Sequence, residues 1–143
     1  GGAALMERLI VDASMAIAWV HPGQATPESD LLLEGIGRGT SVIVPALWFA
    51  EVSNALLVLE RRGRLTGEER AVALESLQSL GFEVDHEMSA LAFTRLSRLA
   101  TELSLSVYDA VYLELAQRLK LPIACKDGPL REAARSRGVA VVP

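Results

Sequence analysis

The sequence predicts a three-layer α/β/α sandwich with a central, mostly parallel five-stranded sheet. Two observations support this fold class. Five short apolar runs of β type alternate along the chain with longer segments of helical periodicity. Strands that are separated by helices need crossover connections, and such connections join parallel strands and place helices on the faces of the sheet.

The five predicted strands are short runs rich in branched apolar residues. The first run ends at Asp12. The second is stopped by Pro45, whose fixed φ and missing N–H suit the first turn of the helix that follows. The strands are predicted over Leu9–Val11, Ser41–Val44, Phe82–Val84, Pro122–Cys125 and Val139–Val142.

Capping and breaking residues mark the predicted helices. Thr66 and Glu69 form a capping-box pattern that predicts a helix start, and Gly63 and Gly81 mark helix ends. The helices are predicted over Ser29–Ile36, Ala46–Arg62, Thr66–Leu80, Ser89–Leu103, Val107–Leu119 and Pro129–Ser136.

Length and composition indicate one folded domain. Half of the 143 residues are hydrophobic and 22% are charged, which argues against disorder and provides enough apolar residues for a core. We predict a single domain over residues 6–143, with residues 1–5 as an artificial extension ahead of a natural start at Met6. No apolar run approaches the roughly 20 residues of a membrane-spanning helix.

Charge and cysteine content restrict the function only in part. The net charge of −4 argues against a broad phosphate-binding surface, but carboxylates gathered at a metal site would also make the balance acidic. Arginines cluster near residues 61–64 and 131–137, and solvated helix ends are the favoured explanation of both clusters over a nucleic-acid surface. Because the single cysteine, Cys125, cannot form an internal disulfide, we expect a cytoplasmic protein.

Two aspartates follow predicted strands. Asp12 comes directly after the first strand, and Asp127 stands two residues beyond the fourth. If both strands are central and parallel, these carboxylates meet at the edge of the sheet where ligands gather. Asp is also a preferred N-cap residue, so each could instead cap the next helix. Ser14 could orient Asp12, or it could simply begin a helix at Met15.

Glu51 lies in a helix that is apolar on nearly every side, which predicts burial on more than one face. A carboxylate in such surroundings needs a cation, a hydrogen-bond network or protonation. Glu51 is therefore a candidate metal ligand with Asn54 as a supporting residue, and a buried salt bridge is the alternative. Trp48 and Phe49 on the same helix indicate either an interface or internal core.

Asp109 completes the candidate set. It stands three residues after Ser106, which matches the capping pattern, and the first turn of a helix also stabilises an anion. A cap and a metal ligand can therefore share this position. Several carboxylates without a Cys or His set indicate a hard cation, so Mg²⁺ is expected, with Mn²⁺ as a substitute. His21 and His86 lack the spacing of metal ligands.

Four segments occur in an order and at a spacing that are specific as a set. They are residues 10–14 (Ile-Val-Asp-Ala-Ser), residues 45–56 (Pro, then Glu-Val-Ser-Asn-Ala-Leu), residues 104–112 (with Tyr-Asp-Ala-Val-Tyr) and residues 123–127 (Ile-Ala-Cys-Lys-Asp). Together they resemble the PIN-domain ribonucleases, particularly the VapC-type toxins of bacterial toxin–antitoxin pairs.

The resemblance implies a PIN fold and an Mg²⁺- or Mn²⁺-dependent endoribonuclease whose products carry a 5′-phosphate and a 3′-hydroxyl. Carried onto matching positions, the catalytic and metal-binding acids are Asp12, Glu51, Asp109 and Asp127. The metal would activate a water molecule and neutralise charge on the phosphate, and a carboxylate such as Asp127 could accept the proton of that water. Cys125 stands where the family commonly has Thr or Ser, and a thiol is a poorer hydrogen-bond donor for supporting Asp127.

The resemblance also implies RNA as substrate, a homodimer and a cognate VapB-like antitoxin that blocks the site. Receiver and phosphatase domains are rival classes, because they too place acids at strand ends. A phosphatase has a second Asp at the position of Ser14, and a receiver has paired acids at the first strand, so neither pattern fits. A catalytically inactive PIN-like module that only binds protein is a further alternative, against which the four acids argue.

Overall fold

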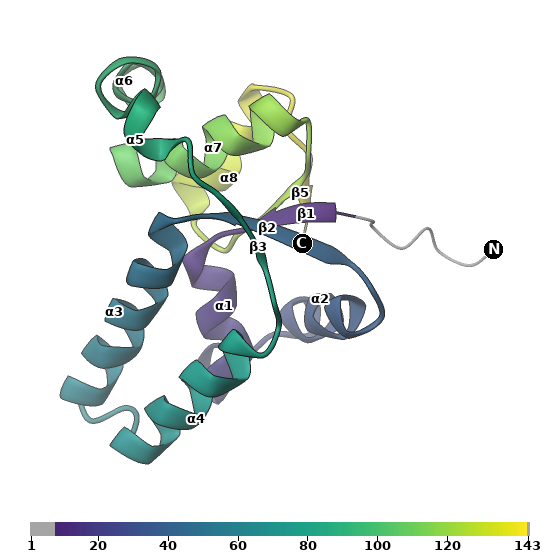
Figure 1. Ribbon diagram of the computed structural model, residues 1–143, viewed down its shortest axis with the longest axis vertical. Coiled ribbons are helices and arrows are strands. Elements are labelled where there is room, and N and C mark those ends of the chain that lie inside the picture. The colour runs from purple at the N-terminus through teal and green to yellow at the C-terminus, as the bar shows by residue number, and fades with distance from the viewer. Residues whose placement is uncertain (1–7, 143) are drawn as a thin grey trace.

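The structure, a computed structural model, describes residues 8–142, so the predicted extension at residues 1–5 and the start at Met6 lie outside it. Five parallel strands form one sheet in the order β3-β2-β1-β4-β5. In Figure 1, helices α1 to α4 lie on one side of the sheet and α5 to α8 lie on the other. The predicted three-layer α/β/α fold is confirmed.

The central strand is covered on both faces. β1 (Arg8–Val11) pairs on one side with β2 (Ser41–Pro45) and on the other with β4 (Ile123–Ala124). Leu9, Ile10 and Val11 have no exposed surface, as expected for a strand between two helical layers. The edge strands are β3 (Glu83–Asp85) and β5 (Val141–Val142).

Pro45 lies at the end of a strand and not in a helix. It is the last residue of β2, where it pairs with Asp85, and the next helix begins at Leu47. The prediction that Pro45 stops the strand and lies in the first turn of the next helix is therefore wrong. Pairing of β2 with β1 ends at Ile43, so no hydrogen bond of that ladder needs the missing N–H of Pro45. β4 and β5 are also shorter than predicted.

Polar side chains cap most of the helices at their first turn. In α4 (Gly67–Gln78) the predicted capping box is present, because Thr66 Oγ1 accepts from Glu69 N at 3.1 Å and Glu69 Oε1 accepts from Thr66 N at 2.8 Å. A second capping box, made by Thr26 and Ser29, starts α2 two residues earlier than predicted. The other helices are α1 (Ala13–Val20), α3 (Leu47–Arg61), α5 (Met88–Leu91), α6 (Ser97–Leu103), α7 (Val107–Leu119) and α8 (Gly128–Ser136), with α2 at Pro27–Gly37.

Two irregular segments were not predicted. A 3₁₀ turn, η1 (Pro22–Gln24), follows α1, and a π-helical segment, η2 (Ala92–Leu96), joins α5 to α6. None of the helices in the described part of the chain has the length and apolar character needed to cross a bilayer.

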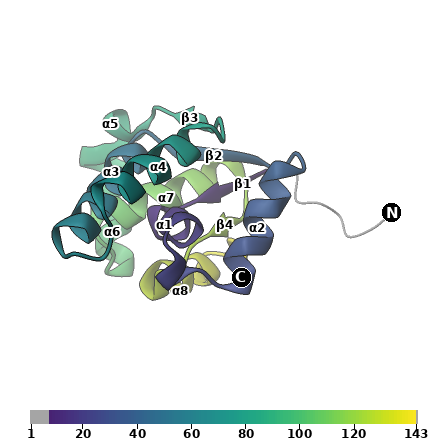
Figure 2. The same ribbon diagram turned by 90° about the horizontal axis from the view of Figure 1, so that it is seen from below.

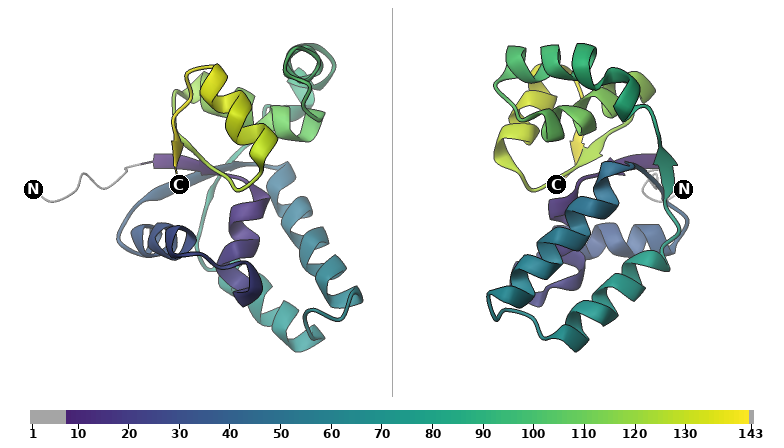
Figure 3. Two further views of the ribbon diagram at one scale, coloured as in Figure 1. Left: turned by 180° about the vertical axis from the view of Figure 1, so that it is seen from behind. Right: turned by 60° about the vertical axis from the view of Figure 1, so that its left-hand side comes forward.

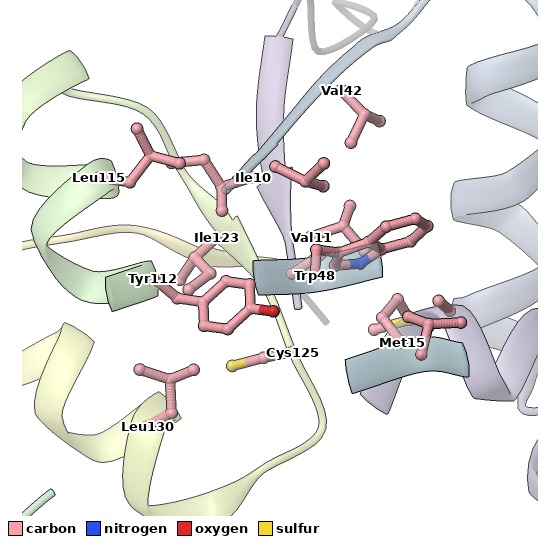
Figure 4. Close-up of a cluster of buried hydrophobic side chains, with 14 of the residues drawn as sticks. Ile10, Val11, Met15, Val42, Trp48, Tyr112, Leu115, Ile123, Cys125 and Leu130 are labelled. Atoms are coloured by element: carbon pink, nitrogen blue, oxygen red, sulfur yellow. The ribbon is translucent and has the colours of Figure 1, made fainter. Parts of the chain in front are cut away.

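α1 occupies the centre of the lower helical layer. It contacts α2, α3 and α4, and the view from below shows it among them (Figure 2). Figure 3 shows α3 and α4 as a hairpin that extends away from the sheet. Side chains from the sheet strands β1, β2 and β4 and from α1, α3, α7 and α8 form one buried cluster (Figure 4).

α3 is buried along one stripe only. Its fully buried residues recur at helical spacing, and the remaining faces are partly or largely exposed, so the prediction of burial on several faces is wrong. Trp48 is buried and packs edge-on against Phe82 at a centroid distance of 5.1 Å. Phe49 packs on Trp48 but keeps 46% of its surface exposed. The two aromatic residues thus divide between core and surface.

Arg118 connects α7 to the end of edge strand β3. Its guanidinium donates to both carboxylate oxygens of Asp85 at 3.0 and 2.9 Å and to the buried Glu114 at 2.9 Å. These hydrogen bonds hold the pKa of Asp85 below its usual value. The side chain of Glu114 is only 3% exposed, so Arg118 is the close counter-ion of a buried carboxylate.

Replacing Arg118 should destabilise the protein strongly. Arg118→Met leaves Glu114 buried without its close partner, and we expect a loss of about 3 kcal/mol in the free energy of unfolding, measured by urea denaturation. Arg137→Met is the matched control, since Arg137 pairs with the exposed Glu102 at the surface and should cost less than about 1 kcal/mol. Equal losses in the two variants would contradict this assignment.

Candidate active site

The order in which the chain adds parallel strands to the sheet reverses between β1 and β4. From β1 the chain builds β2 and β3 on one side, and it returns later to build β4 and β5 on the other. Val11 pairs with Ala124, and the backbone N–H of Asp12 donates to the carbonyl of Ala124 at 3.1 Å. Asp12 and the segment that leads to Asp127 therefore leave the sheet side by side, at a point where open α/β sheets bind ligands.

Asp12 is fixed from two directions. It caps α1, with Oδ1 accepting from Met15 N at 3.1 Å, and the hydroxyl of Ser14 lies 2.7 and 2.9 Å from its two carboxylate oxygens. Ser14 Oγ in turn accepts from the backbone N–H of Lys126 at 3.0 Å. Ser14 therefore contacts Asp12, as the first of the two predictions proposed, whereas the alternative that Ser14 begins a helix at Met15 is wrong, because α1 begins at Ala13 and is capped by Asp12. Asp12 itself is only 5% exposed.

Asp127 is partly exposed and caps α8. Its Oδ2 accepts from the backbone N–H of Leu130 at 2.9 Å. Support for this carboxylate thus comes from the α8 backbone and does not depend on the residue at position 125. Burial raises the pKa of Cys125 to about 12, so its thiol is protonated and unreactive at neutral pH.

Glu51 is half-buried on α3 and is held by a residue that the sequence analysis did not select. The hydroxyl of Tyr112, on α7, donates to Glu51 Oε1 at 2.5 Å. Within residues 8–142 Glu51 takes part in no ion pair, so the salt-bridge alternative is wrong. Asn54 is exposed and makes no side-chain hydrogen bond to another described residue, so the structure does not bring it to Glu51.

The signal for Tyr112 was present but not distinctive. A tyrosine inside an apolar helix is usually core, although its hydroxyl needs a hydrogen-bond partner when it is buried. Tyr112 is 1% exposed, and no pattern in the chain indicates which of the acidic residues its hydroxyl contacts.

Asp109 lies in the first turn of α7, beside Asp127. Its backbone N–H donates to Ser106 Oγ at 3.0 Å, which caps the helix as the sequence predicted. Burial raises the pKa of the Asp109 carboxyl, and the charge of Asp127 together with a hydrogen bond to it raises that pKa further. The more distant charges of Asp12 and Glu51 act in the same direction.

Burial also raises the pKa of Asp12 and of Glu51. Burial raises the pKa of Asp12 to about 6, against hydrogen bonds from Ser14 and Met15 that lower it, and the charges of Asp127 and Glu51 contribute to the rise. Burial also raises the pKa of Glu51, although the Tyr112 hydrogen bond lowers it. None of the ion pairs in the described part of the chain includes any of the four acids.

This donor set suits a hard divalent cation, although the side chains do not form a closed cage. Across residues 8–142, no three His, Cys, Asp or Glu side chains are grouped closely enough to hold a metal ion by themselves. The four acids nevertheless interact electrostatically at one edge of the sheet and have no basic partner. Carboxylate oxygens without sulfur or imidazole fit a cation that keeps several water ligands, as Mg²⁺ does.

Comparison with known proteins decides the family. The family model of the PIN domain matches residues 9–136. The chain belongs to the PIN domain family. PIN domains are typically nucleases and generally depend on divalent metals. This match excludes the alternative that the chain is a receiver or phosphatase domain.

Two solved structures are similar to this PIN domain. PAE2754 from Pyrobaculum aerophilum has a TM-score of 0.70 and 24% sequence identity, and the match covers 99% of this chain and 87% of that chain. FitAcB from Neisseria gonorrhoeae has a TM-score of 0.65 and 19% identity, with 94% of this chain and 96% of that chain covered. At these identities the likeness is one of fold. No curated protein sequence matches the chain.

The metal-free PIN domain should lose stability as the pH rises from about 4 to about 6. The folded pKa of Asp12 is about 6, whereas an unfolded aspartate has a pKa of about 3.9. In this window the folded state binds more protons than the unfolded state, so the free energy of unfolding falls as the pH rises.

We expect Asp12 to contribute about 3 kcal/mol to this fall, and Asp109 to act in the same direction. Urea denaturation of the metal-free protein at several pH values measures the effect. Asp12→Asn is the comparison, because it removes the titrating group and should flatten the profile. The assignment would be contradicted if the free energy of unfolding of the unchanged protein rose with pH relative to that of Asp12→Asn.

Proposed function

We propose that this PIN domain is an Mg²⁺-dependent endoribonuclease, with Mn²⁺ able to replace Mg²⁺, and that it is the toxin of a VapC-type toxin–antitoxin pair. One observation carries the proposal. Asp12, Glu51, Asp109 and Asp127 come from four separate parts of the chain and interact at one edge of the sheet, without a basic partner among the described residues. An inactive binding module has no need for such a costly group of acids.

Each acid has a role that follows from its surroundings. Asp12 is the most buried of the acids, the charges of Asp12 and Asp109 are each opposed by neighbouring acids, and Glu51 completes the ligand set from α3. The bound cation supplies positive charge for the acids and the phosphate and makes a water molecule more acidic. Asp127 has one oxygen engaged by Leu130 N–H, and its second oxygen is suited to accept a proton from the attacking water.

An RNA strand can reach this edge of the sheet. Asp12 is buried beneath it, whereas Glu51, Asp109 and Asp127 are each partly exposed. Tyr108, adjacent to Asp109, has 62% of its surface exposed and offers an aromatic ring on which an unpaired base can stack. RNA as substrate also places the activity in the cytoplasm.

Cleavage of RNA by the purified protein tests this function. Cleavage should require Mg²⁺, stop on addition of EDTA and fall by about 100-fold or more in Asp12→Asn and in Asp109→Asn, the loss expected for a key electrostatic group. His86→Ala is the control, because His86 is exposed and follows β3. The proposal fails if both aspartate variants cleave as fast as the unchanged protein.

A homodimer and a VapB-like antitoxin are part of the proposal. Phe49 supports an interface on α3, because 46% of its surface is exposed. We propose that the antitoxin binds at this exposed ring and extends over the start of α3, the helix that carries Glu51, to block access to the acids.

Co-expression with the protein encoded beside this chain tests the partnership. The pair should co-purify, and the complex should cleave RNA more slowly than the free PIN domain. Phe49→Ala should weaken the complex and leave cleavage by the free protein unchanged. Phe93→Ala, at a fully exposed phenylalanine on η2, is the matched control. A complex that retains full activity would rule out this neighbour as the antitoxin.

A further inference from the structure

Tyr112 joins the two helical layers at the edge of the sheet where the acids meet. Its ring belongs to α7, on one side of the sheet, and its hydroxyl donates to Glu51 of α3, on the other. Figure 4 shows the ring among Ile123, Cys125 and Leu130, with the hydroxyl at its tip directed away from α7. With 1% of its surface exposed, the ring is held in place by packing.

Glu51 depends on this hydroxyl for its orientation. Tyr112 makes the only side-chain hydrogen bond to Glu51 found within residues 8–142, and no ion pair replaces it there. The charges of Asp12 and Asp109 oppose an inward position of the Glu51 carboxylate. Glu51 is only half-buried, so a rotation toward solvent would relieve both the repulsion and the burial.

We infer that Tyr112 is a positioning residue, which holds Glu51 within the group of acids so that Glu51 can bind the divalent cation. The inference rests on the proposed function, because it assigns Glu51 a place in the metal site. The hydroxyl engages Oε1, and Oε2 accepts no side-chain hydrogen bond within residues 8–142, so the carboxylate keeps lone pairs that would be available to a cation. A preformed position matters here because the described acids do not by themselves form a closed cage.

A double-mutant cycle with metal alone tests this role. The four proteins are the unchanged chain, Tyr112→Phe, Glu51→Gln and the double variant, and the measurements are the Mn²⁺ affinity and the rise in Tm that Mn²⁺ produces. Tyr112→Phe should weaken Mn²⁺ binding about tenfold, as loss of a residue that orients a metal ligand commonly does. In the Glu51→Gln background the same change should have no further effect, because the two residues act as a unit.

Two variants separate positioning from packing. Tyr108→Phe removes an exposed hydroxyl one turn earlier on α7 and should leave Mn²⁺ binding unchanged. Glu51→Asp keeps the charge but withdraws the carboxylate from the hydroxyl, so it should weaken Mn²⁺ binding as Tyr112→Phe does. Glu51→Asp also tests the role without touching the core, should Tyr112→Phe fail to fold.

The outcomes distinguish this inference from the function on which it rests. If Asp12→Asn loses Mn²⁺ binding while Tyr112→Phe and Glu51→Asp keep it, Tyr112 is a core residue only and the proposed function stands. Independent, additive losses in the cycle would also overturn the inference, because Tyr112 would then act by another route. If the unchanged protein gains no stability from Mn²⁺ or Mg²⁺, the metal site and the role of Tyr112 fall together.

Discussion

The pairing of β1 with β4 is the constraint on which the candidate site depends. Because Val11 lies opposite Ala124, the chain leaves two neighbouring strands at the same edge and carries Asp12 and Asp127 with it. The positions of two helices follow from the parallel connections. α3 starts where β2 ends, and α7 runs back across the sheet to the point where β4 begins, so both helices start at this same edge. Glu51 and Asp109 lie near those helix starts and therefore arrive at the same place.

The acids contribute to folding as well as to the site. Asp12 and Asp127 cap helices, and Asp109 lies in the first turn of a third, where backbone N–H groups favour a negative charge. Helix starts therefore offset part of the repulsion that the site creates. Glu51 lies in the second turn of its helix, away from unpaired N–H groups, and obtains its hydrogen bond from Tyr112 instead.

Local patterns predicted the strands, the capping box at Thr66 and the layer order, because each depends on residues close together in sequence. Glu51 could be selected for its apolar surroundings, but its partner lies 61 residues away and nothing in the pattern links the two. Helical spacing alone suggested Asn54 as a supporting residue. The burial of Trp48 fixes the rotation of α3 about its axis, and that rotation leaves Asn54 facing solvent.

The central position of the first strand has a consequence during synthesis. A chain leaves the ribosome from its N-terminus, so β1 emerges long before β4, which begins at Ile123. Asp12 cannot meet Asp127 until β4 and the residues that follow it have left the ribosome. A nascent chain that has not yet reached Asp127 thus lacks a complete set of acids, and the order of the strands delays the assembly of the site until β4 has been made.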